Sequence, residues 1–486
     1  HNTPDILSIR YKAPKISDNN RIVYQISGSN GMKEVIHKDT KAIKDYVTLD
    51  MDGNPKFISY YDKNNKHLAV TKMILPDGVA EGETVRFKCK FIDTQEEDLF
   101  INWGDGQYST ELDDQGYASH TYSSEINTES KIYIYGSIES IGDLTTSEDS
   151  LIDLTLSNTM TWIPASAFKD ATCIKSVTIP SSIKSINESA FKGATNLTKV
   201  TFENNPSIQE IKGNAFNGSG LTEFVIPKTV TTIGDYAFSG TKLTKIVIPK
   251  TVTSIGVYVF SECELLTTAA FEEGTTITTI MEGLFRNSGL TSFTFPKSIT
   301  KIWSFSFEGT DIESITIPKT VTEISQYAFS DCLSLTSFTF EEGIQIDSIP
   351  YAMFWGSNKL SDITIPKTVT SIRTAAFADT GLTSIVIPNS VTSISDFAFS
   401  GSTLLESVTF EENSKLETIG EHVFEETGII NIKIPKSVKS IGRYLFTNCP
   451  NLQTVEFEEG SEITEIVDSM FSECSFTSFI FPDGIT

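Results

Sequence analysis

Histidine and cysteine are the side chains best suited to acid–base, nucleophilic or metal chemistry, so their placement is considered first. The five histidines are scattered along the chain: His1, His37, His67, His120 and His422. No G-x-S-x-G, H-E-x-x-H, Walker or Rossmann motif accompanies them. Catalysis needs titratable groups that converge on one place. The sequence therefore predicts no catalytic residues, no cofactor, no metal site and a protein that is not an enzyme.

The six cysteines do not form a disulfide framework in a chain of 486 residues. Cys89 stands apart, and none belongs to a C-x-x-C pair. The other five each follow a recurring phenylalanine by three to five residues: Cys173, Cys263, Cys332, Cys449 and Cys474. This placement favours thiols that fill small buried apolar sites. Zinc binding and a catalytic thiol are the alternatives.

Composition and charge exclude several classes of partner. The chain has 38 basic and 63 acidic residues and a formal net charge of -25, which repels phosphate backbones and anionic lipid headgroups. No stretch approaches roughly 18 consecutive apolar residues. We therefore expect no nucleic-acid partner and no membrane insertion.

The hydrophobic content of 39% is that of an ordinary folded protein, and about 150 residues per domain would give roughly three domains.

An internal repeat shows that the estimate of three globular domains is wrong. Fourteen phenylalanines recur at intervals of 22, 23 or 25 residues, a spacing that indicates a solenoid. They are Phe168, Phe191, Phe216, Phe238, Phe260, Phe285, Phe307, Phe329, Phe354, Phe377, Phe399, Phe424, Phe446 and Phe471. One coil of about 23 residues cannot bury its apolar side alone, so the coils must stack on one another.

Residues 381–400, "GLTSIVIPNSVTSISDFAFS", show what one unit encodes. Ile385 and Ile387 alternate with outward residues, which predicts a short strand. Pro388 removes a backbone donor and ends that strand. Phe399 closes the turn in a short helical or looped segment. The recurring strand segments predict fifteen parallel strands on the concave side, the first at 151–156 and the last at 476–481.

Five units replace the proline with glutamate. Their strands end at Phe202, Phe271, Phe340, Phe410 and Phe457, and these are the 25-residue units. They lie 69, 69, 70 and 47 residues apart. A block of three units is thus predicted to have been duplicated, with one unit missing near the end. Duplication in blocks indicates a surface that tolerates lengthening, as a scaffold does and a single active site does not.

The pattern L-x-x-I-x-I-P-x-x-V-x-x-I-x-x-x-A-F resembles the BspA-like, or treponemal, class of leucine-rich repeats. It is carried by "LTEFVIPKTVTTIGDYAF" at 221–238, by 243–260 and by 312–329, and it covers residues 151–486. The Phe-Glu-Glu units depart from it. The resemblance implies a leucine-rich-repeat solenoid with parallel strands on the concave face and short strands, turns, 3-10 or helical segments on the convex face. It also implies a secreted or cell-surface protein that takes part in adhesion.

The first 150 residues follow a different pattern. Short alternating strands between 73 and 143 favour a β-sandwich. "NWGDG" and "SHTYS" resemble the PKD domain through residues 103–106 and 120–122, where the turn and the tyrosine corner are structural. The alternative is a calcium or ligand role for Asp105, Asp113 and Asp114.

The predicted domains are a small β-rich module at 1–72, a PKD-like or Ig-like sandwich at 73–145 and a solenoid of about 14 repeats at 146–486. Within the first module, residues 46–61 favour a hairpin turning at Asp52 and Gly53, and residues 31–46 favour a short helix.

Stacked coils turn single positions into columns. The outward residue in the middle of each strand forms a threonine-rich column, and its central part is the predicted ligand-binding surface: Thr294, Thr316, Thr339, Thr364 and Val386. A neighbouring column alternates lysine and glutamate, as at Lys250, Glu273 and Lys297. These charges either neutralise one another along the stack or form part of a partner's footprint.

A third column lies two residues before each repeat phenylalanine and contains Tyr327 among other aromatic residues. Its rings are interpreted as spacers between coils or as contacts for a partner. Trp303 and Trp355 break the repeat pattern and are the other candidates for a specific aromatic contact.

The sequence favours a non-enzymatic, secreted or cell-surface adhesion scaffold. It would present the concave face of the solenoid to a protein ligand on a host surface, on another cell or in the matrix. One alternative is a carbohydrate-binding accessory protein that uses the aromatic columns as sugar platforms and so binds a glycan. Another is a passive structural surface protein that self-associates end to end.

Overall fold

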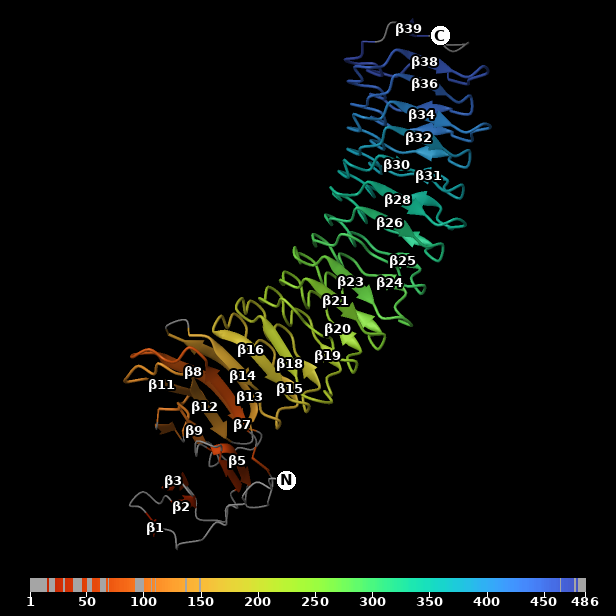
Figure 1. The fold of residues 1–486 in the computed structure, drawn as a ribbon. Coiled ribbons are helices and arrows are strands. Elements are labelled where there is room, and N and C mark those ends of the chain that lie inside the picture. The colour runs from red at the N-terminus through yellow and green to blue at the C-terminus, as the bar shows by residue number, and fades with distance from the viewer. Residues whose placement is uncertain are drawn as a thin grey trace.

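The computed structural model describes residues 70–91, 100–105, 107–109, 111–135, 138–147, 150–463, 465–475 and 478–479, together with six short strands between residues 15 and 68. These residues form strands and turns, and no helix occurs among them. Figure 1 shows a small β-rich part at one end, from which a long bent stack of coils extends. The predicted solenoid fold is confirmed.

The six N-terminal strands form antiparallel pairs. They are β1 (Lys15–Ile16), β2 (Ile22–Gly28), β3 (Gly31–His37), β4 (Tyr46–Leu49), β5 (Pro55–Tyr61) and β6 (His67–Leu68). The hairpin predicted for residues 46–61 is present as β4 and β5. The helix predicted from residue 31 is wrong over β3, because seven residue pairs with β2 hold that segment extended.

The next seven strands form two sheets. They are β7 (Val70–Leu75), β8 (Thr84–Phe91), β9 (Phe100–Asn102), β10 (Tyr108–Ser109), β11 (Tyr117–Thr121), β12 (Ser130–Tyr135) and β13 (Ile138–Thr146). One sheet contains β10, β9, β12 and β7, and the other contains β11, β8 and β13. Phe87, Trp103 and Tyr122 are fully buried among these strands.

The first of these sheets continues directly into the solenoid. Strand β7 pairs antiparallel with β12 on one side and with β14 (Ile152–Thr155), the first strand of the solenoid, on the other. In addition, the Asp143 N–H donates to the Ala167 carbonyl at 2.8 Å, and the Ser150 hydroxyl donates to the buried Glu83 carboxylate at 3.0 Å. The β7 edge therefore caps the first coil, which would otherwise expose its apolar side and unpaired backbone groups.

Most coils contribute one strand to a first parallel row, and these strands have four or more residues except for β30 and β39, which have two. After β14 these strands are β16 (Ile174–Ile179), β18 (Lys199–Phe202), β21 (Lys245–Ile248), β23 (Thr268–Phe271), β26 (Ser314–Ile317), β28 (Ser337–Phe340), β30 (Asp362–Ile363), β32 (Ser384–Ile387), β34 (Ser407–Phe410), β36 (Asn431–Ile434), β38 (Thr454–Phe457) and β39 (Ser478–Phe479). The outward side of this row is called the long-strand face below. Residues 480 and 481 of the predicted last strand lie outside the described residues.

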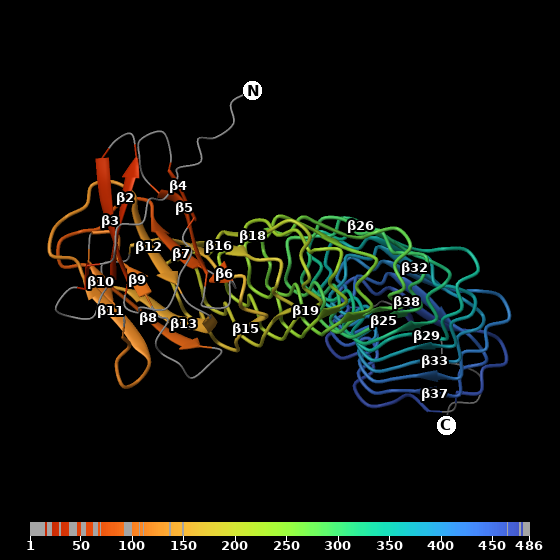
Figure 2. The same cartoon turned by 90° about the horizontal axis from the view of Figure 1, so that it is seen from below.

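A second parallel row consists of two-residue strands. They are β15 (Trp162–Ile163), β17 (Ser185–Ile186), β19 (Glu210–Ile211), β20 (Thr232–Ile233), β22 (Ser254–Ile255), β24 (Thr279–Ile280), β25 (Lys301–Ile302), β27 (Glu323–Ile324), β29 (Ser348–Ile349), β31 (Ser371–Ile372), β33 (Ser393–Ile394), β35 (Thr418–Ile419) and β37 (Ser440–Ile441). Figure 2 shows the two rows along opposite edges of the stack. The outward side of this second row is called the short-strand face.

The repeat phenylalanines form a continuous column of rings between the two rows. Neighbouring rings stack with centroids 5.1 Å apart at Phe168 and Phe191 and 5.2 Å apart at Phe307 and Phe329. These rings are fully buried, and each one covers the ring of the next coil. The core is therefore one-dimensional, because a coil is buried by its neighbours.

The turn around each phenylalanine is a loop and not a helix. Non-glycine residues with φ near +55° recur two residues before and two residues after it, as Tyr327 (φ 56°) and Asp331 (φ 52°) do around Phe329. Right-handed helices require negative φ at every position, so these residues prevent helix formation. The helical form of the turn that the sequence left open is thus wrong in the described coils.

Two of the fifteen predicted strands do not form. Residues 224–226 lie in no strand, and residues 290–295 contribute a single bridge from Ser292 to Thr268. Both segments follow a Phe-Glu unit. Each Phe-Glu strand pairs with the strand before it over four residues. With the strand after it, the pairing is shorter: two residues between β28 and β30, and one between β34 and β36. In the long-strand row the coils after Phe-Glu units are therefore paired less completely than the Phe-Glu coils themselves.

The glutamate that replaces proline holds the preceding coil. The Glu272 N–H donates to the Ile248 carbonyl at 2.8 Å, a bond that proline cannot make. The Glu272 carboxylate accepts from the Lys250 N–H at 3.0 Å. The same carboxylate contact recurs at Glu203, Glu341, Glu411 and Glu458. This glutamate latch explains why the Phe-Glu units pair fully with the coil before them.

The latch should make stability depend on pH. The Lys250 backbone N–H, helped by Lys228, holds the pKa of Glu272 below its usual range. A depressed carboxyl pKa stabilises the fold above the pKa of the unfolded chain, and the gain is lost as pH falls through the folded pKa. We expect Glu272→Gln to lower the melting temperature at pH 7, with the difference shrinking between about pH 5 and pH 3. Thermal melts across this range test it, with Glu273→Gln as the control; a constant difference would contradict the latch.

The phenylalanine column predicts a large loss on truncation. Phe329→Ala should reduce the free energy of unfolding by about 3–5 kcal/mol, because it leaves a cavity that the stacked coils cannot close. Phe397→Ala removes a ring that is 41% exposed, so its loss in the free energy of unfolding should be clearly smaller. Urea denaturation of the two variants makes the comparison, and equal losses would argue against the column as the main support.

Candidate binding surface

The histidine of the sandwich belongs to a packed corner. His120 Nε2 lies 2.8 Å from Asp105 Oδ2, and the His120 ring stacks on Trp103 with centroids 5.0 Å apart. The Tyr122 hydroxyl donates to the Trp103 carbonyl at 2.8 Å. This geometry favours the structural interpretation of residues 103–105 and 120–122.

The aspartates considered as calcium ligands hold turns. Asp105 accepts from the Gln107 N–H and Asp113 from the Gln115 N–H, each at 2.9 Å. The Tyr117 N–H also donates to Asp113 and is the main cause that lowers the pKa of that carboxyl. Within the described residues, no three His, Cys, Asp or Glu side chains group so as to hold a metal ion.

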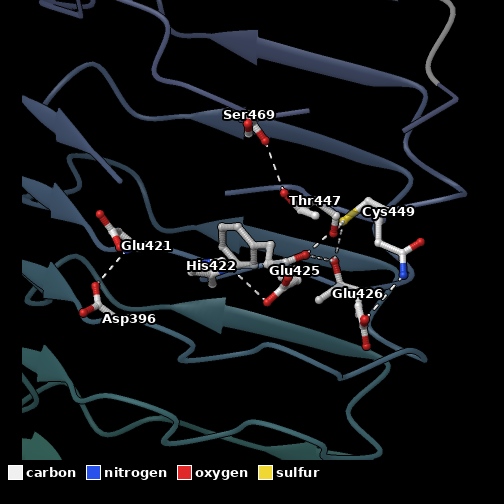
Figure 3. Close-up of polar contacts among 11 residues, drawn as sticks. Asp396, Glu421, His422, Glu425, Glu426, Thr447, Cys449 and Ser469 are labelled. Atoms are coloured by element: carbon white, nitrogen blue, oxygen red, sulfur yellow. Dashed lines mark hydrogen bonds and ion pairs between the residues drawn. The ribbon is translucent and has the colours of Figure 1, made fainter. Parts of the chain in front are cut away.

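The histidine of the solenoid, His422, lies among carboxylates and rings. Its Nδ1 is 3.0 Å from Glu425 Oε2, and its ring stacks on Phe397 and Tyr444 with centroids 4.6 and 4.7 Å apart. Figure 3 shows the surrounding acidic side chains. Asp396 accepts the Glu421 N–H at 2.8 Å. These contacts tie neighbouring coils together.

The five residues predicted to bind a ligand lie along the long-strand face, and all five are exposed: Thr294, Thr316, Thr339, Thr364 and Val386. Thr316 pairs in register with Thr339, and the register of β28 with β30 continues the row toward Thr364. Thr294 lies on the coil that forms only a bridge. The structure thus aligns Thr316, Thr339 and Thr364 in register, whereas no ladder among the described residues joins the coils of Thr294 and Val386 to them. None of the five side chains carries a formal charge.

The lysines beside that column pair across two coils. Lys228 Nζ lies 3.4 Å from Glu272, and Lys367 Nζ lies 3.6 Å from Glu411. The glutamates are those of the latch rather than the adjacent residues of the predicted alternating column. Both lysine side chains are 81% exposed, so these pairs contribute little to stability. Their main effect is to keep the border of the threonine column close to neutral.

The aromatic column forms separate stacks between coils. Tyr236 stacks on Tyr258 at 5.1 Å, and Phe305 stacks on Tyr327 at 5.0 Å. Gly283 separates the two stacks, and a Cβ there would lie 2.2 Å from the Tyr258 ring. Because the ring faces cover one another, these aromatics act mainly as spacers between coils.

The three aromatic candidates do not form one site. Trp303 follows β25, Tyr327 belongs to the aromatic column, and Trp355 follows the core residue Phe354. Trp355 is 42% exposed and donates through Nε1 to Asp379 at 3.0 Å. Tyr327 contacts Tyr351 edge to face at 5.2 Å, and this contact connects it to the groove described next.

A groove of about 530 Å³ opens on the short-strand face between β27 and β29. Its lining includes Lys301, Glu323, Asp347, Tyr351 and Arg373. The sequence predictions missed these residues. One signal was available: Pro350 stands where the other Phe-Glu units have Lys212, Met281, Gly420 and Val467, each with a backbone N–H.

Parallel coils of 22 to 25 residues with inward leucine, isoleucine and phenylalanine define a leucine-rich-repeat solenoid. The chain belongs to the family described as BspA type leucine rich repeat region, whose model matches residues 139–267, 205–310, 266–382 and 370–486. No curated protein matches the chain. No described helix is long and apolar enough to cross a membrane.

Several solved structures are similar to this chain. A leucine-rich repeat protein from Bacteroides ovatus is 21% identical, with a TM-score of 0.44 over 66% of this chain and 95% of that one. Pneumococcal vaccine antigen PcpA is 20% identical, with a TM-score of 0.38 over 65% and 71%. A leucine rich cell surface protein from Faecalibacterium prausnitzii is 23% identical, with a TM-score of 0.32 over 55% and 92%.

The cysteines should differ in reactivity. Burial raises the pKa of Cys89 and of Cys332 to about 12, whereas a hydrogen bond with Cys449 lowers the pKa of the less buried Cys474 to about 7. The thiolate is the reactive form. We therefore expect Cys474 to be alkylated first by iodoacetamide at pH 7.5, as mapped by mass spectrometry, and Cys474→Ser to remove this fast phase. Equal labelling of Cys332 would contradict the prediction.

Proposed function

We propose that the chain is a non-enzymatic adhesion scaffold, secreted or at the cell surface, whose long-strand face binds a protein ligand. The ligand would be a protein of a host surface, of another cell or of the matrix. The observation that carries the proposal is the exposed set of residues from Thr294 to Val386, within which the coil register aligns Thr316, Thr339 and Thr364. Membership of the BspA family supports a repeat scaffold and a place outside the cell.

The physical character of this column suits a protein partner. Threonine and valine are stiff at χ1, so they lose little side-chain freedom when an interface covers them. Their methyl groups offer apolar contact, and the threonine hydroxyls both donate and accept hydrogen bonds. A stable interface covers about 800 Å² on each partner, an area that several neighbouring coils would supply together.

The N-terminal part is proposed to hold the solenoid away from its point of attachment. We assign residues 1–72 to a small β-rich module, 73–145 to a PKD-like sandwich and 146–486 to the repeat domain. The buried Trp103, His120 and Tyr122 corner supports the PKD assignment. The β7–β14 pairing supports a second role for the sandwich as the cap of the solenoid.

Substitution of the column tests the binding face. Thr316, Thr339 and Thr364 changed together to Glu should reduce capture of a host matrix protein or adhesion to host cells by about tenfold or more, because three buried charges would lack partners. Fibronectin, fibrinogen, laminin and collagen, together with epithelial cells, are suitable probes in surface plasmon resonance and cell-binding assays.

The matched control places the same charges on the other face. Thr231, Thr253 and Thr392 are exposed beside the short strands, and their joint change to Glu should leave binding at the wild-type level. Equal loss in both triple variants would indicate a general charge effect. Unchanged binding in the first variant would overturn the long-strand face as the adhesive surface.

A further inference from the structure

The short-strand row is split where the groove lies. Strands β24, β25 and β27 form one sheet and β29 to β37 form another, so no ladder joins β27 to β29. The side chain of Ile324 in β27 is half-buried, whereas Ile302 and Ile349 in the coils on either side are fully buried. The split therefore exposes part of the core between two coils.

The local sequence accounts for one backbone hydrogen bond that is missing between the coils of β27 and β29. In the Phe-Glu unit of β35, the Gly420 N–H donates to the Ile394 carbonyl at 2.8 Å, and in that of β19 the Lys212 N–H donates to the Ile186 carbonyl at 2.9 Å. Pro350 occupies the same position after β29 and has no N–H to donate to Ile324. The backbone bond that joins two coils at the equivalent position in the β19 and β35 units is thus absent beside the groove.

The lining combines opposite charges and neutral polar groups. Lys301 and Arg373 supply two cations, while Glu323 and Asp347 supply two carboxylates, so the lining has no net formal charge. Lys301 Nζ lies 2.7 Å from Glu323 Oε2. The remaining polar lining residues are Ser304, Thr322, Ser325, Gln326 and Ser348. The lining thus offers both hydrogen-bond donors and hydrogen-bond acceptors to a ligand.

An aromatic ring stands at the rim of this polar depression. Tyr351 is 39% exposed and lines the groove. Its ring is positioned by the edge-to-face contact with Tyr327 at 5.2 Å, and its carbonyl accepts the Tyr327 N–H at 3.2 Å. A hydrogen bond to Tyr351 also raises the pKa of Tyr327 to about 12. Tyr351 keeps an exposed surface, as do Tyr236, Phe397 and Tyr444 in the stacks, and differs from them in lining the groove.

We propose that this groove binds a neutral oligosaccharide. Sugar hydroxyls both donate and accept, which matches a lining of carboxylates, cations, hydroxyls and an amide, and the C–H face of a pyranose packs on an aromatic ring. The volume of about 530 Å³ lies within the range of small-ligand sites, which is about 300–1,000 Å³. The lining has no excess positive charge that would attract an anion, and the chain as a whole has a net charge of -25 that repels one. An anionic ligand is therefore disfavoured.

The test uses the full chain and a defined panel of sugars. Maltohexaose, cellohexaose, mannohexaose, chitohexaose and an N-acetyllactosamine oligomer are titrated by isothermal calorimetry and by saturation-transfer NMR. At least one should bind saturably. Tyr351→Ala, which removes the ring, and Ser325→Trp, which fills the groove, should each weaken that binding by about tenfold or more.

Two controls make the outcome decisive. Tyr444→Ala removes an aromatic ring that is 37% exposed and lies outside the groove, and it should leave sugar affinity unchanged. The triple glutamate variant of the long-strand face should also keep sugar binding, which separates this site from the protein-binding proposal. Failure of every sugar to bind the wild-type chain, wild-type affinity in both groove variants, or an equal loss in Tyr444→Ala would overturn the proposal.

Discussion

Stacking of one coil on the next is the interaction on which the rest of this structure depends. A unit of 22 to 25 residues has too little volume to enclose its own phenylalanine, so each ring is buried by the rings of adjacent coils, as Phe307 is by Phe329. Every coil therefore requires a neighbour on both sides. The first coil obtains its neighbour from the sandwich through the pairing of β7 with β14.

The alternation of proline and glutamate units modulates this stacking. Proline ends a strand without offering a donor, whereas the glutamate latch adds a backbone bond and a carboxylate bond to the preceding coil. In the long-strand row each Phe-Glu coil thus pairs more completely with the coil before it than with the coil after it. In the short-strand row the two splits lie before the Phe-Glu coils of β24 and β29.

The two faces have different chemistry for this reason. On the long-strand face the outward positions of β26, β28 and β30 keep their register, so Thr316, Thr339 and Thr364 form an uncharged column. On the short-strand face the row is split between β22 and β24 and again between β27 and β29, and the second split, next to Pro350, lies beside charged side chains and Tyr351. A protein surface and a small-ligand site can therefore exist on the same solenoid without competing for residues.

The sequence by itself determined the repeat, the parallel strands, the buried phenylalanine column and the outward threonines, because each follows from a local period that stacking repeats. It predicted neither the two missing strands, nor the left-handed turns at Tyr327 and Asp331, nor the groove. Those features depend on distances between coils of unequal length, and such distances arise only when side chains far apart in the sequence pack together. The cap likewise required tertiary structure, since the register of β7 against β14 is set by contact and not by any local pattern.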